Sequence, residues 1–375
     1  MLSFWEKQTW FTNVDYCIIG SGLVGLSTAL NLRALFPKAK ILIIERGILP
    51  SGASTKNAGF ACYGSPSEIL DDLQFESENH VFMNVEHRYK GFQQLHSWLG
   101  SKKMGYEAHG GYEIFNSDER DVFNDTHANL EYLNDALLPI FKREAFRSMD
   151  NLIPSFGFKG INHIIGIPSE GQIDTGKTLY HLSKLAIERD ILILNGLEVE
   201  RFQDSNDGVF IHTEQIEFKV NKLAICTNGF AKKLSPNLDV QPTRAQVLIT
   251  NPIENLPIKG VFHMYKGYYY FRNVNNRILF GGGRHLAFQD ENTDSIEVSG
   301  KIQKNLEKTL KNHILPSTKY TIDQSWAGIM GFGTNNNKGV LIEHLSPNTI
   351  CGVRLGGMGI AIGANVGQQI AEKFL

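Results

Sequence analysis

The spacing of hydrophobic and polar residues near the start of the chain predicts a strand, a turn, a helix and a second strand, in that order. Residues Val14–Ile19 form a short apolar run that is rich in β-branched residues and has no helical period, which indicates a buried strand. Apolar side chains then recur on one face of a helix over residues 23–34, and Pro37 ends that helix. A second apolar run over residues 41–44 ends in Glu45. This succession is typical of the first unit of a parallel α/β sheet.

The rest of the chain alternates between helix–strand patterns and strand-rich patterns. An N-terminal arm over residues 1–13 is expected to pack through Phe4, Trp5, Trp10 and Phe11. The further predicted elements are a helical stretch over 68–98, a strand over 111–115, a helix over 174–190, strands over 191–194 and 222–227, antiparallel strands within 246–283, a helix over 295–312 and a closing helix over 363–374.

The turn after the first strand carries a chemical argument. It reads Gly20-Ser21-Gly22-Leu23-Val24-Gly25. The first glycine permits a tight turn, the second lets the backbone approach a diphosphate, and the third lets the helix pack on the strand. The N-terminus of the helix offers free N–H groups to an anion. Glu45, at the end of the second strand, is placed to accept the hydroxyls of an adenosine ribose and disfavours a 2′-phosphate. The sequence therefore predicts a dinucleotide site.

The α/β signals occur at the start, middle and end of the chain, with strand-rich segments between them. We therefore predict an α/β fold, α+β overall, with a Rossmann-like nucleotide-binding domain built from discontinuous segments and a second domain with an antiparallel sheet. The nucleotide-binding domain is assigned to residues 1–80, 165–240 and 322–375, and the substrate-binding domain to 81–164 and 241–321. The length of 375 residues fits two domains, since single cores rarely grow beyond about 250–300 residues.

Composition narrows the class of partner. The chain has 37 Lys and Arg against 39 Asp and Glu. Its net charge of −2 lacks the positive excess that is typical of nucleic-acid-binding proteins. No apolar run reaches the roughly 18 residues of a membrane span, and the N-terminus lacks a signal-peptide pattern. The four cysteines are far apart and no histidine pair has metal-ligand spacing, so no metal is expected. We expect a cytoplasmic protein with buried thiols.

A run of small residues after Glu45 separates two kinds of dinucleotide. Residues 54–60 read Ser-Thr-Lys-Asn-Ala-Gly-Phe and lead into another turn. An NAD enzyme has no need of this run, whereas a flavin enzyme does, because its cofactor threads deep into the fold. A plain surface loop is the alternative interpretation.

At this point the chain resembles the D-amino-acid oxidase (DAO) superfamily of FAD-dependent oxidoreductases, which includes glycine oxidase, sarcosine oxidase and D-amino-acid dehydrogenases. The resemblance covers nearly the whole chain and rests on the order of several loose motifs. These motifs are the flavin-contacting run 54–60, the helix entry 171–174, the strand 196–199, the apolar strand and turn 223–229, the Pro-x-Arg-x-Gln segment 242–246, Trp-Ala-Gly at 326–328 and the last glycine turn 355–360.

The resemblance implies bound FAD and hydride transfer from an amine carbon to flavin N5, after which the imine hydrolyses to a carbonyl compound. The substrate would be a small amine or amino acid. Besides the first glycine turn and Glu45, the residues implied in FAD binding are Arg46, Ser54, Thr55, Asn57, Ala58, Gly59, Phe60, Val199, Thr227, Asn228, Gly229, Arg354, Gly356, Gly357, Met358, Gly359 and Ile360.

The chain departs from the family pattern in three places. No cysteine occurs at 329–333, where sarcosine-type members attach flavin, so we expect non-covalent FAD. The strand 277–280 lacks an oxygen-activating lysine, which weakens the case for an oxidase, and oxygen and a quinone are both kept as candidate electron acceptors. No Arg or Lys follows the last glycine turn at 358–361, so a carboxylate partner must come from elsewhere.

The side chains expected around the reacting atoms come from two regions. Tyr270 and Arg272 share one face of a strand, together with Tyr268, because side chains alternate along a strand. Arg284 follows a run of three glycines that could aim it at the flavin. Trp326 is the remaining candidate, and His263 and His285 are weaker ones. Each arginine could equally be a structural surface residue.

Other functions fit parts of the sequence. Residues 171–178 match the phosphate-binding pattern G-x-x-x-x-G-K-[ST], but Asp174 would place a carboxylate among the phosphates. An NAD-linked dehydrogenase shares the first turn and leaves the later glycine turns unexplained. A flavin-dependent tRNA-modification enzyme is a third alternative, which the net charge disfavours.

Overall fold

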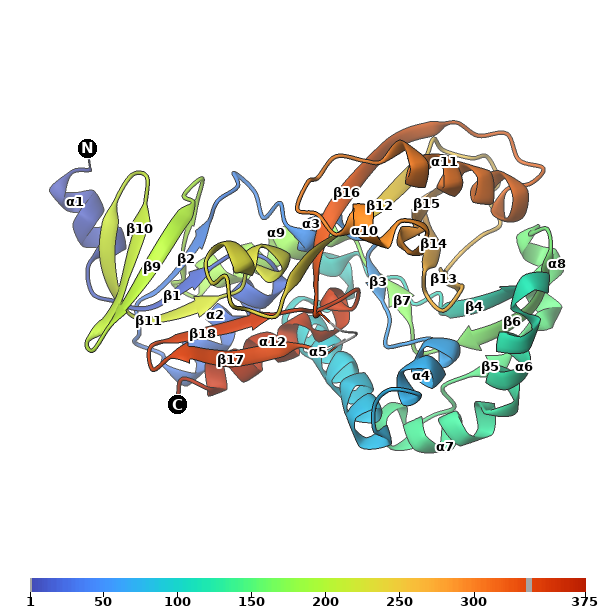
Figure 1. Ribbon diagram of the computed structural model, residues 1–375, viewed down its shortest axis with the longest axis horizontal. Helices are drawn as coiled ribbons and strands as arrows, with labels where there is room; N and C mark the ends of the chain where they lie inside the picture. Colours follow the sequence, from blue (N-terminus) through green and yellow to red (C-terminus); the bar gives the residue numbers. More distant parts are fainter. Residues whose placement is uncertain (1, 335–338) are drawn as a thin grey trace.

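The computed structural model describes residues 2–334 and 339–375, and its strands form two large sheets at opposite ends of an elongated molecule (Figure 1). The first sheet has the strand order β17-β18-β11-β1-β2-β8, and β9 and β10 extend it beyond β11. Strand β1 lies between β2 and β11 and pairs with both in parallel, which confirms the predicted α/β start of the chain. The strands are β1 (Val14–Ile19), β2 (Ile41–Glu45), β8 (Leu192–Asn195), β9 (Val199–Ser205), β10 (Gly208–Thr213), β11 (Glu217–Ile225), β17 (Leu341–Ser346) and β18 (Thr349–Val353).

Helices pack closely beside this sheet because glycines remove side chains at the crossings. A Cβ on Gly367 of α12 would lie 2.6 Å from the backbone nitrogen of Thr28 in α2. A Cβ on Gly91 of α5 would lie 2.3 Å from the carbonyl oxygen of Ala361 in α12. The helices that contact one another here are α2 (Leu23–Leu35), α5 (Glu78–Met104), α9 (Thr175–Glu188) and α12 (Gly359–Glu372).

The second sheet has the order β16-β12-β15-β14-β13-β4-β6-β5 and is antiparallel except where β13 meets β4. Its strands are β4 (Gly111–Asn116), β5 (Arg147–Ser148), β6 (Ile161–Ile167), β12 (Gln241–Thr250), β13 (Val261–Met264), β14 (Tyr269–Val274), β15 (Arg277–Gly282) and β16 (Ile322–Phe332). Around it lie α4 (Pro66–Leu73), α6 (Arg120–Ala128), α7 (Leu130–Phe141), α8 (Ile153–Phe156), α10 (Phe288–Glu291) and α11 (Gly300–Thr309). Between the sheets, α3 (Ala53–Lys56) precedes β3 (Phe60–Ala61), which pairs with β7 (Gly171–Gln172).

Two predicted helices are divided in the structure, and capping residues explain the first division. The stretch 68–98 becomes α4 and α5, because Ser65 and Ser77 each cap a new helix. The stretch 295–312 becomes α11 followed by the π-helix η6 (Leu310–Ile314). Short 3₁₀ segments complete the path at η2 (Ser117–Glu119), η3 (Asp150–Leu152), η4 (Asn228–Lys233) and η5 (Arg284–Leu286).

The N-terminal arm differs from its prediction. It folds into α1 (Phe4–Glu6) and the π-helix η1 (Lys7–Phe11). The expected packing of Phe4 and Trp5 is wrong, since these side chains are 68% and 75% exposed. The helix projects from the end of the sheet (Figure 1), and Phe11 lies against Phe218 at a ring distance of 4.8 Å.

Two stretches of the chain lie with a different sheet from the one implied by the domain boundaries that we assigned from the sequence. Strand β16 pairs along most of β12, so residues 322–332 belong to the antiparallel sheet. Helix α5 contacts α12 and α9, so much of the stretch 81–104 lies beside the parallel sheet. Neither position could be read from local patterning, because both depend on contacts between distant segments.

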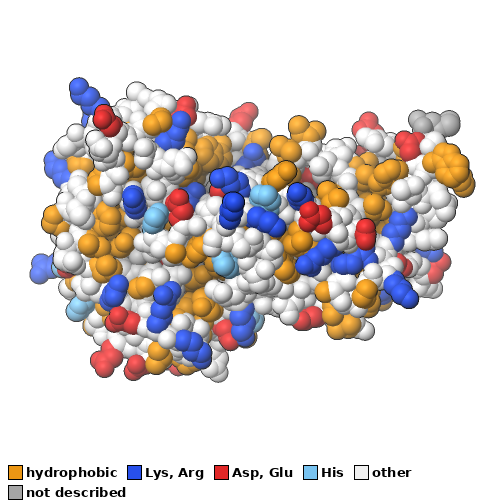
Figure 2. Space-filling view, turned by 180° about the vertical axis from the view of Figure 1, so that it is seen from behind, with side chains coloured by type: hydrophobic (Ala, Val, Ile, Leu, Met, Phe, Trp, Pro, Cys, Tyr) orange, Lys and Arg blue, Asp and Glu red, His pale blue; other side chains and the backbone are white. Residues whose placement is uncertain are grey.

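One face of the molecule carries mixed charge. On the face shown in Figure 2, Lys and Arg side chains lie across the middle with Asp, Glu and apolar side chains among them. No helix within the described parts of the chain is long and apolar enough to cross a bilayer.

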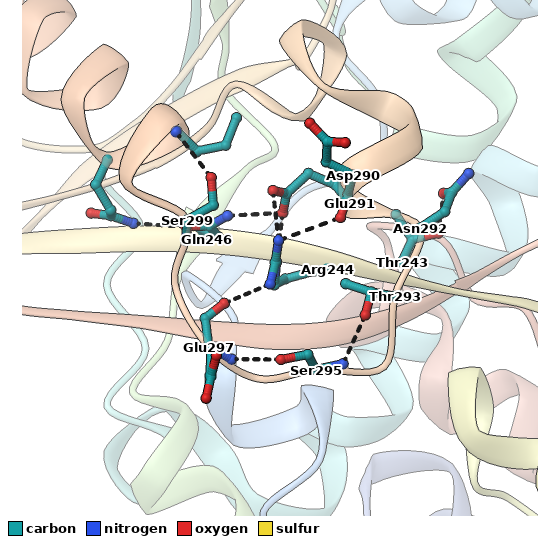
Figure 3. Close-up of polar contacts among 12 residues, drawn as sticks. Thr243, Arg244, Gln246, Asp290, Glu291, Asn292, Thr293, Ser295, Glu297 and Ser299 are labelled. Carbon is teal, nitrogen blue, oxygen red and sulfur yellow. Dashed lines mark hydrogen bonds and ion pairs between the residues drawn. The ribbon is translucent and has the colours of Figure 1, made fainter.

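A buried ion pair fastens the loop after β15 onto β12. Arg244 of β12 donates from Nε and Nη2 to the carboxylate of Glu291 at 2.8 and 2.9 Å, and from Nη1 to the carbonyl oxygen of Glu297 at 2.7 Å (Figure 3). Gln246 donates to the same carboxylate at 2.8 Å and accepts the N–H of Ser299. The Pro-x-Arg-x-Gln segment thus fixes the path of residues 290–299.

Removing one partner of this pair leaves a buried guanidinium without its counter-charge. We expect Glu291→Gln to lower the free energy of unfolding by about 3 kcal/mol, measured by urea denaturation of the FAD-loaded protein. The control is Glu297→Gln, because Arg244 contacts only the backbone of this exposed residue. Equal stabilities of the two variants would contradict the assignment.

Candidate functional site

The first glycine turn is set by backbone contacts that exclude side chains. Gly20 has φ +104°, and a Cβ there would lie 2.9 Å from the carbonyl oxygen of Cys226. A Cβ on Gly25 would lie 1.9 Å from the carbonyl oxygen of Gly20, so α2 packs directly on the end of β1. A Cβ on Gly22 would meet Ser54 Oγ at 2.8 Å. Ser54 accepts the N–H of Leu23 at 2.9 Å, which joins the run 54–60 to the start of α2.

Glu45 is held in a fixed position beside this turn. Its Oε2 accepts the backbone N–H and the hydroxyl of Ser21 at 3.0 and 3.1 Å, and its Oε1 accepts the N–H of Gly47 at 2.9 Å. The side chain is buried and lines a cavity. A carboxylate has further lone pairs for ligand hydroxyls. The position therefore suits the ribose contact expected from the sequence.

A cavity of about 530 Å³ extends from the glycine turn to the antiparallel sheet. Most residues implied in FAD binding line it together, although they come from four separate parts of the chain. The lining includes Gly20, Gly22, Leu23, Val24, Glu45, Arg46, Ser54, Asn57, Ala58, Gly59, Phe60, Val199, Thr227, Asn228, Gly356, Gly357, Met358, Gly359 and Ile360. The structure therefore brings these motifs into one site.

Some of the implied residues support the cavity from outside its lining. Ser21 orients Glu45, and Gly25 permits the helix contact already described. Thr55 donates to the carbonyl oxygen of Pro50 at 2.7 Å. Gly229 lies so close to Met330 that a Cβ would be 2.4 Å from its carbonyl oxygen.

Arg354 does not direct its guanidinium into the cavity. Its Nη1 contacts Asp239 at 2.7 Å and its Nε donates to the carbonyl oxygen of Gly339 at 2.6 Å. Its backbone N–H donates to Asn228 Oδ1 at 3.0 Å, which ties two lining segments together. The left-handed φ of +67° at Arg354 turns the side chain this way, and local sequence could not reveal it.

The cavity also has an unused hydrogen-bonding group. Thr227 Oγ1 is buried, lines the cavity and has no hydrogen-bond partner among the residues that the structure describes. Buried polar groups are ordinarily paired, so this hydroxyl points to a bound ligand. The set of a glycine turn, a fixed carboxylate and an unpaired hydroxyl fits a flavin dinucleotide.

The opposite end of the cavity is built by aromatic and ionisable side chains. Phe60 meets His263 and Tyr270 edge to face, at ring distances of 5.4 and 5.8 Å. Burial raises the pKa of Tyr270 to about 12 although nearby Arg284 lowers it, so the phenol is neutral. Cys62, Glu68 and Gly267 complete this end.

His263 lines the cavity and forms a buried ion pair with a carboxylate outside the lining. Its Nε2 lies 2.9 Å from Glu170 Oε2, and both residues are almost fully buried. Burial alone would lower the pKa of His263, but Glu170, with Glu68 and Glu113, raises it to about 9. His263 is therefore protonated at neutral pH. The sequence analysis did not identify Glu68 or Glu170. The local signal at Glu68 is the helix-capping pattern Ser65-x-x-Glu68.

The other predicted catalytic side chains lie around the cavity rather than in its lining. Arg272 donates to the carbonyl oxygen of Gly59 at 3.3 Å, and burial lowers its pKa to about 10. Arg284 lies over the rings of Phe332 and Phe288, at 4.4 and 5.0 Å.

Trp326 supports the wall from behind, since its Nε1 donates to the carbonyl oxygen of Lys56 at 3.1 Å. His285 packs against Tyr268 and Tyr269.

The thiols are consistent with non-covalent flavin. All four cysteines are free and buried. Burial raises the pKa of Cys226 to about 12 and that of Cys351 to about 11, and raises the pKa of Cys17 and Cys62 as well. The thiolate is the reactive form, so these side chains are poor nucleophiles.

The phosphate-loop alternative at residues 171–178 is wrong. Asp174 caps α9, and its Oδ1 accepts the N–H of Lys177 at 2.9 Å. Its other oxygen lies 3.6 Å from Lys177 Nζ. The protein's own carboxylate thus occupies the place that a phosphate would need. Among described residues, no three His, Cys, Asp or Glu side chains form a group that could hold a metal ion.

Comparison with known proteins decides the family. A sequence model described as "FAD dependent oxidoreductase" (DAO) matches residues 15–373. The chain belongs to the DAO family of FAD-dependent oxidoreductases. FAD is accordingly its cofactor, and the NAD alternative falls away.

Individual relatives are distant. An L-2-hydroxyglutarate dehydrogenase of Escherichia coli O17:K52:H18 is 22% identical over 332 residues, covering 80% of this chain and 72% of the relative. The crystal structure of L-proline dehydrogenase from P. horikoshii has a TM-score of 0.75 at 16% identity, covering 96% of this chain and 92% of that chain. Glycine oxidase from Geobacillus kaustophilus also has a TM-score of 0.75, at 17% identity, covering 96% and 93%. The structural matches show the fold that this DAO-family member shares.

The position of Glu45 predicts a measurable loss of cofactor affinity. Glu45→Gln removes the charge that would strengthen hydrogen bonds from FAD hydroxyls, so the Kd for FAD should rise about ten- to a hundredfold. Flavin fluorescence during titration of the apoprotein measures this.

The control is Glu198→Gln, an exposed lining residue that lies 3.9 Å from Arg46. An unchanged Kd in Glu45→Gln, or an equal loss in both variants, would contradict the role of Glu45.

Proposed function

We propose that this DAO-family member oxidises the C–N bond of an amine or amino acid, and that the resulting imine hydrolyses to a carbonyl compound. FAD, when bound, supplies the hydride acceptor at N5. The protein's part is to orient the substrate and to exclude water. The observation that carries the choice of bond is the buried pairing of His263 Nε2 with Glu170 Oε2 at 2.9 Å, which engages the imidazole that lines the cavity.

Oxidation of a hydroxyl group and oxidation of an amine make different demands on the cavity. A hydroxyl must lose its proton, which calls for a base with a pKa near the working pH. A neutral amine can give up hydride without such a base. His263 is the one imidazole among the described lining residues, and Glu170 keeps it protonated with a pKa of about 9. This arrangement favours C–N oxidation over the C–O chemistry suggested by the name of the dehydrogenase relative.

The neighbouring side chains have supporting roles in this proposal. Phe60, Tyr270 and Met358 form an apolar wall beside the substrate. Arg284 lies near Tyr270, and no described carboxylate forms an ion pair with it. It is the candidate partner for the carboxylate of an amino-acid substrate, since guanidinium groups bind carboxylates in a planar, two-bond geometry.

The electron acceptor remains oxygen or a quinone in this proposal. Strand β15 carries no lysine over residues 277–280, which weakens the case for oxygen. A tRNA-modifying activity has little support, because the net charge of the chain is −2.

Anaerobic reduction of the flavin tests the proposed bond. The purified protein is mixed without oxygen with a panel of primary and secondary amines and amino acids, and separately with 2-hydroxy acids, L-2-hydroxyglutarate included. Loss of the visible flavin absorbance with an amine, together with a carbonyl product, is the expected result. Reduction by a 2-hydroxy acid with none by any amine would overturn the proposal. Return of colour on admission of air would identify oxygen as an acceptor.

A further inference from the structure

Glu68 presents to the end of the cavity built by the antiparallel sheet a carboxylate that forms no ion pair with any described residue. Its Oε2 accepts the N–H of Ser65 at 3.1 Å, which completes the helix cap of α4. Its Oε1 faces the turn between β13 and β14, where a Cβ on Gly267 would lie 2.3 Å away. Both Glu68 and Gly267 line the cavity. The backbone at Ser65 and at Gly267 therefore holds the carboxylate of Glu68 in place, and the carboxylate borders the cavity.

Two of the positive groups near Glu68 are paired with other carboxylates, and the third donates to a backbone carbonyl oxygen. His263, whose pKa is raised partly by Glu68, is paired with Glu170 at 2.9 Å. Lys266 Nζ lies 2.7 Å from Asp71, and Arg88 donates to the carbonyl oxygen of Tyr63 at 2.9 Å. Within the described parts of the chain, no Lys, Arg or His forms an ion pair with Glu68. The three cations and three carboxylates named here balance in charge, but Glu68 is the carboxylate among them that has no ion-pair partner in the described part of the chain.

The remaining walls suit a cation as well. Phe60 and Tyr270 border the same space, and aromatic rings attract ammonium ions. Behind the wall, Glu113 is fully buried and bonded to Ser65 and Ser67. Burial raises the pKa of Glu113 to about 7, so it adds part of a negative charge at neutral pH.

We infer that Glu68 is a specificity-determining residue that holds a second, unreactive ammonium group of the substrate. This inference rests on the proposed C–N oxidation. A nearby carboxylate stabilises the protonated form of an amine, whereas the nitrogen that is oxidised must be neutral. Glu68 is therefore suited to a nitrogen away from the oxidised bond. The substrate class is then a dibasic amine, either a diamine or an amino acid with a basic side chain.

Matched substrate pairs test the inference on the FAD-loaded protein. Each pair differs only in the second amino group: straight-chain diamines against monoamines of equal length, lysine against norleucine, and ornithine against norvaline. The readouts are the apparent Kd and the limiting rate of anaerobic flavin reduction, with a thermal-shift titration as a measure of binding that does not depend on turnover. In whichever pairs are oxidised, the dibasic member should bind about ten- to a hundredfold more tightly.

The variant Glu68→Gln should remove that preference. Glutamine keeps an oxygen for the N–H of Ser65, so the helix cap survives. The Kd of the dibasic member should rise to that of its partner. The control Glu76→Gln removes one negative charge from the neighbouring segment, where Glu76 lies near His80 outside the cavity lining, and should keep the preference.

The outcomes separate this inference from the proposed function. If amines reduce the flavin but the paired compounds bind equally, or if Glu68→Gln keeps the preference, Glu68 is not the determinant and C–N oxidation stands. If no amine reduces the flavin and a 2-hydroxy acid does, the proposed function itself has failed and the inference falls with it.

Discussion

Direct backbone contact at the first glycine turn is the constraint on which the rest of the structure depends. The end of β1 touches both the first turn of α2 and the end of β11, at distances where no Cβ fits. This contact places the N-terminus of α2 at the carboxyl ends of the parallel strands, where α/β folds bind nucleotides. Ser54 and Glu45 then fasten the following segments to the same turn. The cavity is the space that these contacts leave.

Buried ion pairs organise the other half of the molecule. Arg244 and Glu291 hold the loop that carries Arg284 against β12, and His263 and Glu170 join β13 to the segment before β7. Such pairs contribute little net stability, but breaking one leaves a charge uncompensated in a low dielectric. They therefore determine where the arginine, imidazolium and carboxylate groups stand around the cavity. The electrostatics of the substrate end follow from this pairing, since Glu68 is left without an ion-pair partner among the described residues.

The sequence was sufficient for the features that local physics controls. The apolar run before Gly20, the spacing of the three glycines and the acid at Glu45 predict the strand, turn and dinucleotide site without a structure. The later motifs identify the family through their order. Long-range features were out of reach: the direction of Arg354 depends on Asp239, and the place of β16 depends on β12. Glu68 and Glu170 look like helix-cap and loop residues until the fold brings them to His263. The exposure of Phe4 and Trp5 shows that apolar composition alone does not decide packing.

The absorbance spectrum of the purified protein, recorded before and after acid precipitation, tests the central claim that this cavity holds non-covalent FAD. The account predicts the two visible bands of oxidised flavin in the native protein and FAD in the supernatant after precipitation. Flavin that remains with the precipitate would contradict non-covalent binding. A colourless protein that also fails to take up added FAD would contradict the assignment of the cavity itself.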